Sequence, residues 1–326
     1  MKNSNLFGII VGSMVIIAGI SAGTYFAVKN TSFRYIEYGV LSDSEPLPLG
    51  ISEYNILIDC EAETASITVI ADLMTEDNII EIDNTVSGPK SKVDDYPDKA
   101  DYLTITDDGD GNYTINFIKE DPIRLTYRFS HEVEIRVDYR AKLIIDMEVT
   151  TGSAEVILEQ PDQEIDIVSM VATTGNIGLS LPSETLVTGD LFFEATTGSI
   201  SVDINEDCTL DVDTFSLICT TGSVYIDMVN VNFTSDIDVS VDITTGNFNL
   251  DWTQDSILTS HYFNIQGTTG DITIDLTFNE NIGTTFSTSV TTGSVNVPSN
   301  TVNQAGMGLI HFDLDITTGS ILATRH

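Results

Sequence analysis

Residues 149–158 read VTTGSAEVIL, and the same turn returns seven more times along the second half of the chain. Each copy carries the triplet Thr-Thr-Gly, and the eight glycines are Gly152, Gly175, Gly198, Gly222, Gly246, Gly270, Gly293 and Gly319. Their spacings are 23, 23, 24, 24, 24, 23 and 26 residues. A nearly constant period in this range indicates stacked structural repeats.

Apolar residues alternate with polar ones on both sides of each glycine. After Gly222 the apolar positions are Val224, Ile226 and Met228, and before it they are Cys219 and Leu217. Alternation with a period of two predicts a strand with one buried face on each side of the turn. A third apolar position comes about eleven residues after the glycine, at Leu186, Phe233 and Ile257. We therefore expect each repeat to have two long sides and one short side.

The glycines are predicted to be structural corner residues. A sharp corner needs a positive φ angle, which glycine adopts without steric cost. The residue that follows is always Ser, Asn or Asp, whose side chain can bond nearby backbone groups. Stacked threonines could likewise form hydroxyl ladders. The sequence therefore predicts an all-β fold, a parallel β-helix or solenoid with coils of about 23–24 residues.

An earlier, degenerate copy comes before the eight regular ones. In residues 59–72, DCEAETASITVIAD, Ala65 stands where glycine would be expected, and Ile58, Cys60, Ile67 and Val69 have the inward phase. Further on, YLTITDDGDGNYTINF predicts a β-hairpin with a long Asp/Gly turn. The EF-hand pattern does not fit this turn.

The N-terminal segment is strongly apolar. Leu6–Val28 comprises 23 residues without a charge, which is long enough to cross a bilayer as a helix. A cleaved signal peptide is the alternative. The basic residues that flank this segment do not set its orientation, so we place the C-terminal part outside the cell on composition and on three glycosylation sequons.

The expected organisation has four parts. They are residues 1–28, a membrane anchor or signal peptide; 29–55, a juxtamembrane linker; 56–142, a degenerate first coil and hairpin region; and 143–326, the regular solenoid.

The charge distribution limits the classes of partner. The chain has 50 Asp and Glu against 13 Lys and Arg, and between Lys142 and Arg325 it has no Lys or Arg. Nucleic acid is excluded as a partner because it needs cationic contacts to its phosphates. The three cysteines are Cys60, Cys208 and Cys219, and their spacing indicates neither zinc nor a disulfide framework, although one bridge stays open.

One set of acidic residues has a regular spacing. Four aspartates lie five residues after their glycines and 24 residues apart, on the outward phase: Asp203, Asp227, Asp251 and Asp275. In stacked coils they would form a column about 4.8 Å apart. The side chains either splay into solvent or share a bound cation, for which calcium is the candidate. No other cofactor is expected.

The stretch VEIRVDYRAKLIIDMEVTTGSAEVIL, with the repeats that follow, resembles the putative-adhesin family of β-solenoid envelope proteins. The likeness covers about Val133 to Ile321, and the chain departs from the family pattern at Arg140, where proline is frequent. The resemblance implies a parallel β-helix, usually right-handed, and supplies no catalytic residues.

These observations predict a single-pass cell-membrane protein that holds an acidic solenoid outside the cell. We expect a structural or adhesive role without catalysis, with an envelope protein or a glycan as partner. No pair of carboxylates stands out for glycoside hydrolysis, and His261 and His311 are isolated in the sequence. The alternatives are an envelope sensor or scaffold that binds a partner protein, and then an enzyme acting on glycans.

Overall fold

The computed structural model describes residues 38–46, 55–74, 78–87, 103–108, 111–117, 130–302 and 308–326. This part of the chain is all-β, and its 22 strands are hydrogen-bonded into one sheet. The strands are β1 (Tyr38–Pro46), β2 (Asn55–Asp72), β3 (Asn78–Ser87), β4 (Leu103–Asp107), β5 (Asn112–Phe117), β6 (Ser130–Asp138), β7 (Lys142–Thr151), β8 (Ala154–Leu158), β9 (Glu164–Thr174), β10 (Ile177–Leu181), β11 (Leu186–Val187), β12 (Leu191–Thr197), β13 (Ile200–Ile204), β14 (Thr209–Leu210), β15 (Thr214–Thr221), β16 (Val224–Val229), β17 (Asn232–Phe233), β18 (Ile237–Thr245), β19 (Phe248–Gln254), β20 (His261–Phe278), β21 (Gly283–Asn296) and β22 (Leu309–Arg325).

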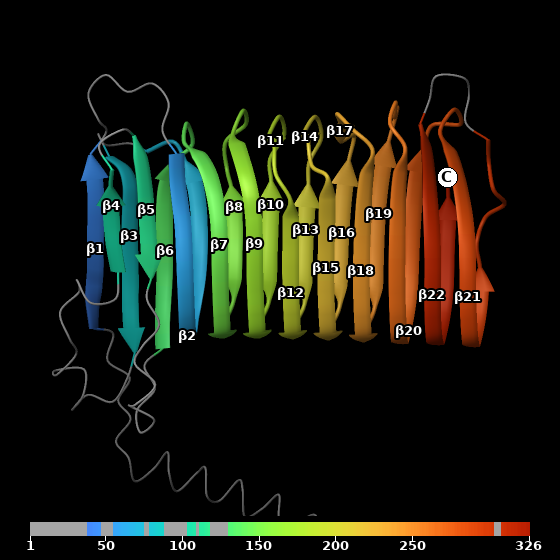
Figure 1. Ribbon diagram of the computed structural model, residues 1–326, viewed down its shortest axis with the longest axis horizontal. Helices are drawn as coiled ribbons and strands as arrows, with labels where there is room; N and C mark the ends of the chain where they lie inside the picture. Colours follow the sequence, from blue (N-terminus) through green and yellow to red (C-terminus); the bar gives the residue numbers. More distant parts are fainter. Residues whose placement is uncertain are drawn as a thin grey trace, which may run out of the picture.

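The repeats stack through parallel strand pairs. The strands that precede the corner glycines pair in the order β7, β9, β12, β15, β18 and β20. The strands that follow the glycines pair in the order β8, β10, β13, β16, β19 and β20, since β20 spans both sides of its corner. Each residue lies beside the residue about one repeat away, as in the pair Asp227 and Asp251. Figure 1 shows these strands side by side along the long axis of the molecule.

The short third side also forms, but its inward position differs from the sequence prediction. Strands β11, β14 and β17 pair in parallel, and the register aligns Val187, Leu210 and Phe233. Leu186 aligns instead with Thr209 and is only partly buried. The apolar position therefore moves by one residue between repeats of slightly different length, which the glycine spacing alone does not resolve.

The predicted alternation between buried and exposed positions is confirmed. Val224, Ile226 and Met228 are each at most 2% exposed, and Trp252 and Phe193 are fully buried. The polar residues between them face outward on both long sides. One continuous apolar core therefore runs through the stack and accounts for the cohesion of its repeats.

The corner glycines have φ values between 138° and 151°. A side chain would also collide with the neighbouring repeat, because a Cβ atom added at Gly246 would lie 1.3 Å from the carbonyl oxygen of Gly222. The same corner reaches back to the degenerate copy, where Thr64 pairs with Thr151. There a Cβ atom at Gly152 would lie 1.7 Å from the carbonyl oxygen of Ala65.

The last two repeats stack in an unexpected order. The sequence predicts that the corners of Gly270, Gly293 and Gly319 follow one another, but β22 pairs with both β20 and β21. Gly319 therefore lies between Gly270 and Gly293, and β21 ends the stack (Figure 1). Arg325 at the end of β22 supports this order, because its guanidinium donates to the carbonyl of Ile282 at 2.7 Å and to the hydroxyl of Thr284 at 2.9 Å.

The other end of the stack is built from antiparallel strands. β6 pairs in parallel with β2 but antiparallel with β3, and β3 pairs antiparallel with β1. The predicted hairpin is confirmed as β4 and β5, which pair antiparallel. The sequence predicts a linker over residues 29–55, and the structure differs, since β1 lies within this range. The strand forms because β3 offers it an edge, which no local pattern reveals.

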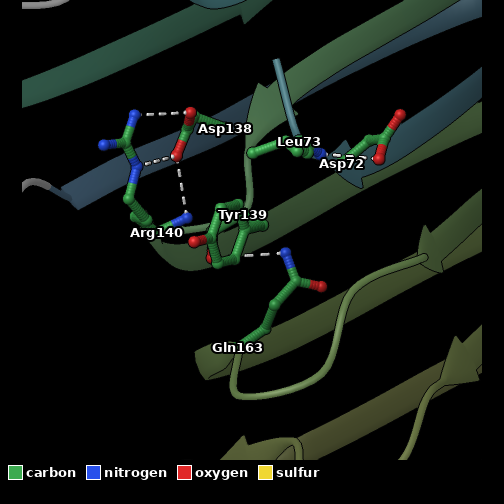
Figure 2. Close-up of polar contacts among 6 residues, drawn as sticks. All are labelled: Asp72, Leu73, Asp138, Tyr139, Arg140 and Gln163. Atoms are coloured by element: carbon green, nitrogen blue, oxygen red, sulfur yellow. Dashed lines mark hydrogen bonds and ion pairs between the residues drawn. The ribbon is translucent and has the colours of Figure 1, made fainter. Parts of the chain in front are cut away.

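The turn between β6 and β7 holds Arg140. Figure 2 shows that its guanidinium donates two hydrogen bonds to the buried carboxylate of Asp138, at 2.7 and 2.9 Å. The backbone N–H of Arg140 donates to the same carboxylate at 3.0 Å, and Gln163 donates to the carbonyl of Tyr139 at 3.4 Å. These hydrogen bonds hold the turn between the two strands.

Candidate functional site

The most regular surface feature is a shallow depression of about 400 Å³ on the face formed by β13, β16, β19 and the second half of β20. Two outward columns of side chains line it. One contains the four aspartates, and the other contains Ser201, Tyr225, Asn249 and Thr273. Tyr225 is 46% exposed and is the one aromatic ring in this lining. The period-two pattern could have identified the second column, because its members lie three residues after their glycines.

The structure brings the four aspartates together as neighbours. Asp203 pairs with Asp227, Asp227 with Asp251, and Asp251 with Asp275, all in parallel register. Parallel pairing places these side chains about 4.8 Å apart on one face. The column is the direct result of three consecutive spacings of 24 residues.

The two ends of the aspartate column differ in their contacts. At one end the hydroxyl of Thr324 donates to Asp275 at 2.7 Å, and the imidazole of His326 lies 3.2 Å from the same oxygen. At the other end Asp203 pairs in register with Ser180. The C-terminal residues therefore add polar groups to one end of the depression.

The electrostatics of the column disfavour its charged form. Partial burial raises the pKa of the Asp203 carboxyl, and burial together with the charge of Asp203 raises the pKa of Asp227. The pKa of Asp251 is raised by burial first and then by the charges of Asp227 and Asp275. Mutual repulsion between neighbours in the column thus adds to the effect of lost hydration.

The geometry bears on the cation hypothesis. Among the residues that the structure describes, no group of three or more His, Cys, Asp or Glu side chains is arranged to hold a metal ion. The aspartates stand in a line along the stack, so each has at most two of the others beside it. Calcium binding at this column stays a hypothesis that the following experiment tests.

We expect the double substitution Asp227→Asn and Asp251→Asn to stabilise the fold at neutral pH. A carboxyl with a raised pKa binds its proton more tightly in the folded chain than in the unfolded chain. The resulting penalty is absent at low pH, grows as the pH rises above the unfolded value near 3.8, and is complete above the folded value. The gain of the variant should therefore be seen at pH 7 and vanish near pH 3, in thermal melts of the full chain with chelator.

A calcium arm of the same melts tests the cation. An ion shared by the column should raise the melting midpoint of the natural chain and leave the double variant unchanged. An equal rise in both chains would place the effect of calcium elsewhere on the acidic surface. If the double variant and the natural chain have the same melting midpoint at pH 7 without calcium, the carboxylates do not oppose folding.

The corner ridge is a second regular feature of the surface. The residue after the glycine forms a side-chain hydrogen bond to the neighbouring repeat at several corners, as Asn247 accepts from the backbone N–H of Asp271 at 3.0 Å and Asp271 from that of Ser320 at 2.8 Å. The expected stacking of the corner threonines is confirmed, since Thr174, Thr197 and Thr221 lie beside one another in register. These threonines are exposed, and no hydrogen bond joins their hydroxyl groups in the described part of the chain. The ridge therefore presents rows of uncharged hydroxyl groups to solvent.

The candidate nucleophiles and bases are dispersed. Cys60, Cys208 and Cys219 are buried, and burial raises the pKa of the Cys208 and Cys219 thiols. His261 is buried in the core, and His311 forms a hydrogen bond with the hydroxyl of Thr285 at 2.6 Å.

A second depression, of about 360 Å³, contains Lys142, which forms ion pairs with Glu164 and Asp166 at 2.7 and 3.4 Å.

Comparison with known proteins gives matches among solved structures only. A putative adhesin from Bacteroides fragilis is 10% identical with a TM-score of 0.39, over 87% of this chain and 97% of that chain. A putative adhesin from Parabacteroides merdae is 13% identical with a TM-score of 0.39, over 87% and 96%. A putative cell adhesion protein from Clostridium sporogenes is 10% identical with a TM-score of 0.27, over 88% and 100%. No family model and no curated protein matches the chain.

The predicted membrane anchor, Leu6–Val28, lies outside the described residues. Within the described residues, no helix has the length and apolar character needed to span a bilayer.

Proposed function

We propose that the protein is a membrane-anchored β-solenoid with a structural or adhesive role outside the cell. The observation that carries this proposal is the parallel register of the repeats, in which residues one period apart lie side by side from β7 to β20. Coils of about 23–24 residues that wind around one core account for this register. The chain thus forms an extended body with long regular faces, which suits a surface spacer or adhesin.

The charge and the N-terminal segment support the same role. Acidic side chains occur among the outward-facing residues of the repeats, and no Lys or Arg occurs between Lys142 and Arg325. Such a surface stays soluble and does not bind nucleic acid. The 23 uncharged residues of Leu6–Val28 are long enough to hold the chain in a membrane. The dispersed histidines and the buried thiols favour a role without catalysis.

Thiol labelling on intact cells tests the location. We expect cysteines introduced by Tyr225→Cys and Leu258→Cys to react with a membrane-impermeant maleimide, because these side chains are 46% and 76% exposed. The natural chain is the control, since its three cysteines are buried. Labelling that requires lysis of the cells would contradict the extracellular location.

Adhesion is then measured directly. Cells that produce the chain should attach to one another or to envelope-coated surfaces more than cells that lack it. Turnover of a panel of envelope glycans by the purified full chain would contradict the non-catalytic role.

A further inference from the structure

The stack ends in a strand whose outer edge is open. β22 lies between β20 and β21, so β21 has a neighbour on one side (Figure 1). At the opposite end of the molecule the antiparallel strands β3 and β1 follow the parallel stack. β21 continues the parallel stack to its last strand, and the described residues place no further strand beyond it.

The hydrogen-bond pattern shows which backbone groups of β21 point outward. In earlier repeats, the corner glycine and the residue two places later donate to the next repeat, as Gly222 donates to Thr245 and Val224 to Asn247, both at 2.9 Å. The equivalent groups in β21 are the N–H groups of Gly293 and Val295. Before the corner, the N–H groups of Thr284 and Phe286 point outward. Strand alternation from these two residues makes the N–H groups of Thr288 and Val290 point outward as well.

Only the N-terminal part of the outer edge of β21 has hydrogen-bond partners. The N–H of Thr284 donates to the hydroxyl of Thr301 at 2.9 Å, and that of Phe286 donates to the side chain of Asn300 at 2.8 Å. Among the described residues, the four later N–H groups have no such partner. A free row of donors and acceptors on an edge strand is a template for pairing with another strand.

The side chains at this edge are apolar or uncharged. Phe286, Val290 and Val297 pack against the end of the core and are only partly buried, and Val295 is 44% exposed. β21 has 14 residues and no charge, whereas β2, β3, β7, β9, β20 and β22, the other strands of ten residues or more, each contain a charged residue. Charges that commonly protect edge strands from pairing are therefore missing from this one.

We propose that β21 is the docking surface for a second copy of this chain, joined end to end about a two-fold axis. A two-fold axis makes the two β21 strands antiparallel, so that the same open groups on each strand serve as donors and acceptors for the other. A basic partner would be drawn to the acidic lateral faces, and at this end it would meet the guanidinium of Arg325, which donates to the hydroxyl of Thr284 in β21. A second β21 strand brings no charge into the contact, although each chain carries a net charge of -37.

This arrangement deepens the proposed function and rests on it for its biological consequence. β1 and β21 lie at opposite ends of the long axis (Figure 1). Two chains joined through β21 would therefore hold their β1 strands far apart. Anchored in facing membranes, such a pair would be a homophilic adhesive contact.

The test is the oligomeric state of the full chain in detergent, measured by sedimentation velocity over a range of concentrations. The variant Thr288→Lys with Val295→Lys places two charges at the open end of the core, because both positions align with buried residues of β22 and are themselves exposed. The matched control, Ser287→Lys with Thr291→Lys, adds the same charge to outward positions of the same strand. The natural chain and the control should form dimers, and the end variant should dissociate at least about tenfold more readily, since an unpaired charge is costly to bury.

Cross-linking provides a second measurement that does not depend on the lysine variants. Chains with Thr288→Cys, Val290→Cys or Val295→Cys should give disulfide-linked dimers at one or more of these positions, and Tyr225→Cys on the lateral face should not. A natural chain that stays monomeric, a series of filaments in place of dimers, or equal dissociation of both lysine variants would overturn the proposal. Cells that adhere through a monomeric chain would separate failure of this contact from failure of the adhesive function.

Discussion

The full chain carrying Gly246→Ala is expected to lose at least about 4 kcal/mol of stability, the largest effect foreseen for a single methyl group in this protein. The added Cβ atom would lie 1.3 Å from the carbonyl oxygen and 2.5 Å from the carbonyl carbon of Gly222. Both atoms belong to the backbone of the preceding corner, so no side-chain rotation can relieve the overlap. The φ angle of 147° is also one that an alanine rarely adopts.

The damage should spread beyond the substituted corner. Each repeat is buried by its neighbours, so a shift of one corner weakens the pairs on both sides of it. Hydrogen exchange should therefore show lost protection in β18 and β19, which flank Gly246, and in β15, β16 and β20, which form the adjacent repeats.

Gly178→Ala is the matched control for this experiment. Gly178 lies in β10, and its added Cβ atom would meet only the flexible side chain of Glu155, at 3.3 Å. We expect this variant to melt close to the natural chain. A Gly246→Ala chain that melts with the control would contradict the packing of the corners described above.

The second large effect is a loss of stability on acidification that depends on His261. This imidazole is fully buried, its Nδ1 atom has no hydrogen-bond partner among the described residues, and its Nε2 atom lies 3.0 Å from the hydroxyl of Thr259. The rings of Phe233 and Trp252 lie beside it, with centroids at 4.2 and 6.3 Å. Burial lowers the pKa of His261 to about 4, and the charge of Asp236 opposes this only in part.

The direction of the pH effect follows from this lowered pKa. Between about pH 6.5 and 4, the unfolded chain binds a proton at His261 that the folded chain does not bind, so stability falls as the pH falls through this window. The difference between the two pKa values corresponds to about 3 kcal/mol once the pH is below 4. Above pH 6.5 the contribution is constant.

His261→Phe should remove this dependence. Denaturant unfolding at pH 7 and pH 4.5 should show a smaller difference between the two pH values in the variant than in the natural chain. His311→Gln is the control, because His311 is partly exposed and accepts or donates a hydrogen bond at Thr285. Equal pH dependence in the natural chain and His261→Phe would show that other groups govern the loss of stability on acidification. The aspartate column is not such a group, because its raised pKa values make acidification stabilise the fold.

Local sequence patterns are sufficient for much of this fold. The Thr-Thr-Gly period locates the corners, and the alternation around it identifies the buried positions, because strand geometry makes every second residue face the core. The spacing of 24 residues also predicts correctly that the four aspartates of the column lie beside one another. Ala65 is recognisable as a degenerate corner for the same reason.

Only one of the two columns of the candidate site, the aspartate column, was identified from the sequence. The aspartates attract notice because they are charged and identical, whereas Ser201, Tyr225, Asn249 and Thr273 differ from one repeat to the next. Their shared position, three residues after each corner glycine, is present in the sequence, but their residue types give no reason to look for it. The raised pKa values within the aspartate column likewise depend on burial and on distances between different repeats.

The sequence by itself determined the corner glycines, the two alternating strands of each repeat and the distribution of charge, since these follow from the backbone and from neighbours along the chain. Only the tertiary structure decided the order of the last repeats, the pairing of β1 with β3 and the open edge of β21. The corners of Gly293 and Gly319 have the same local pattern, so either could follow Gly270. The choice between them depends on long-range contacts, such as those of Arg325 with Ile282 and Thr284, which no period in the sequence encodes.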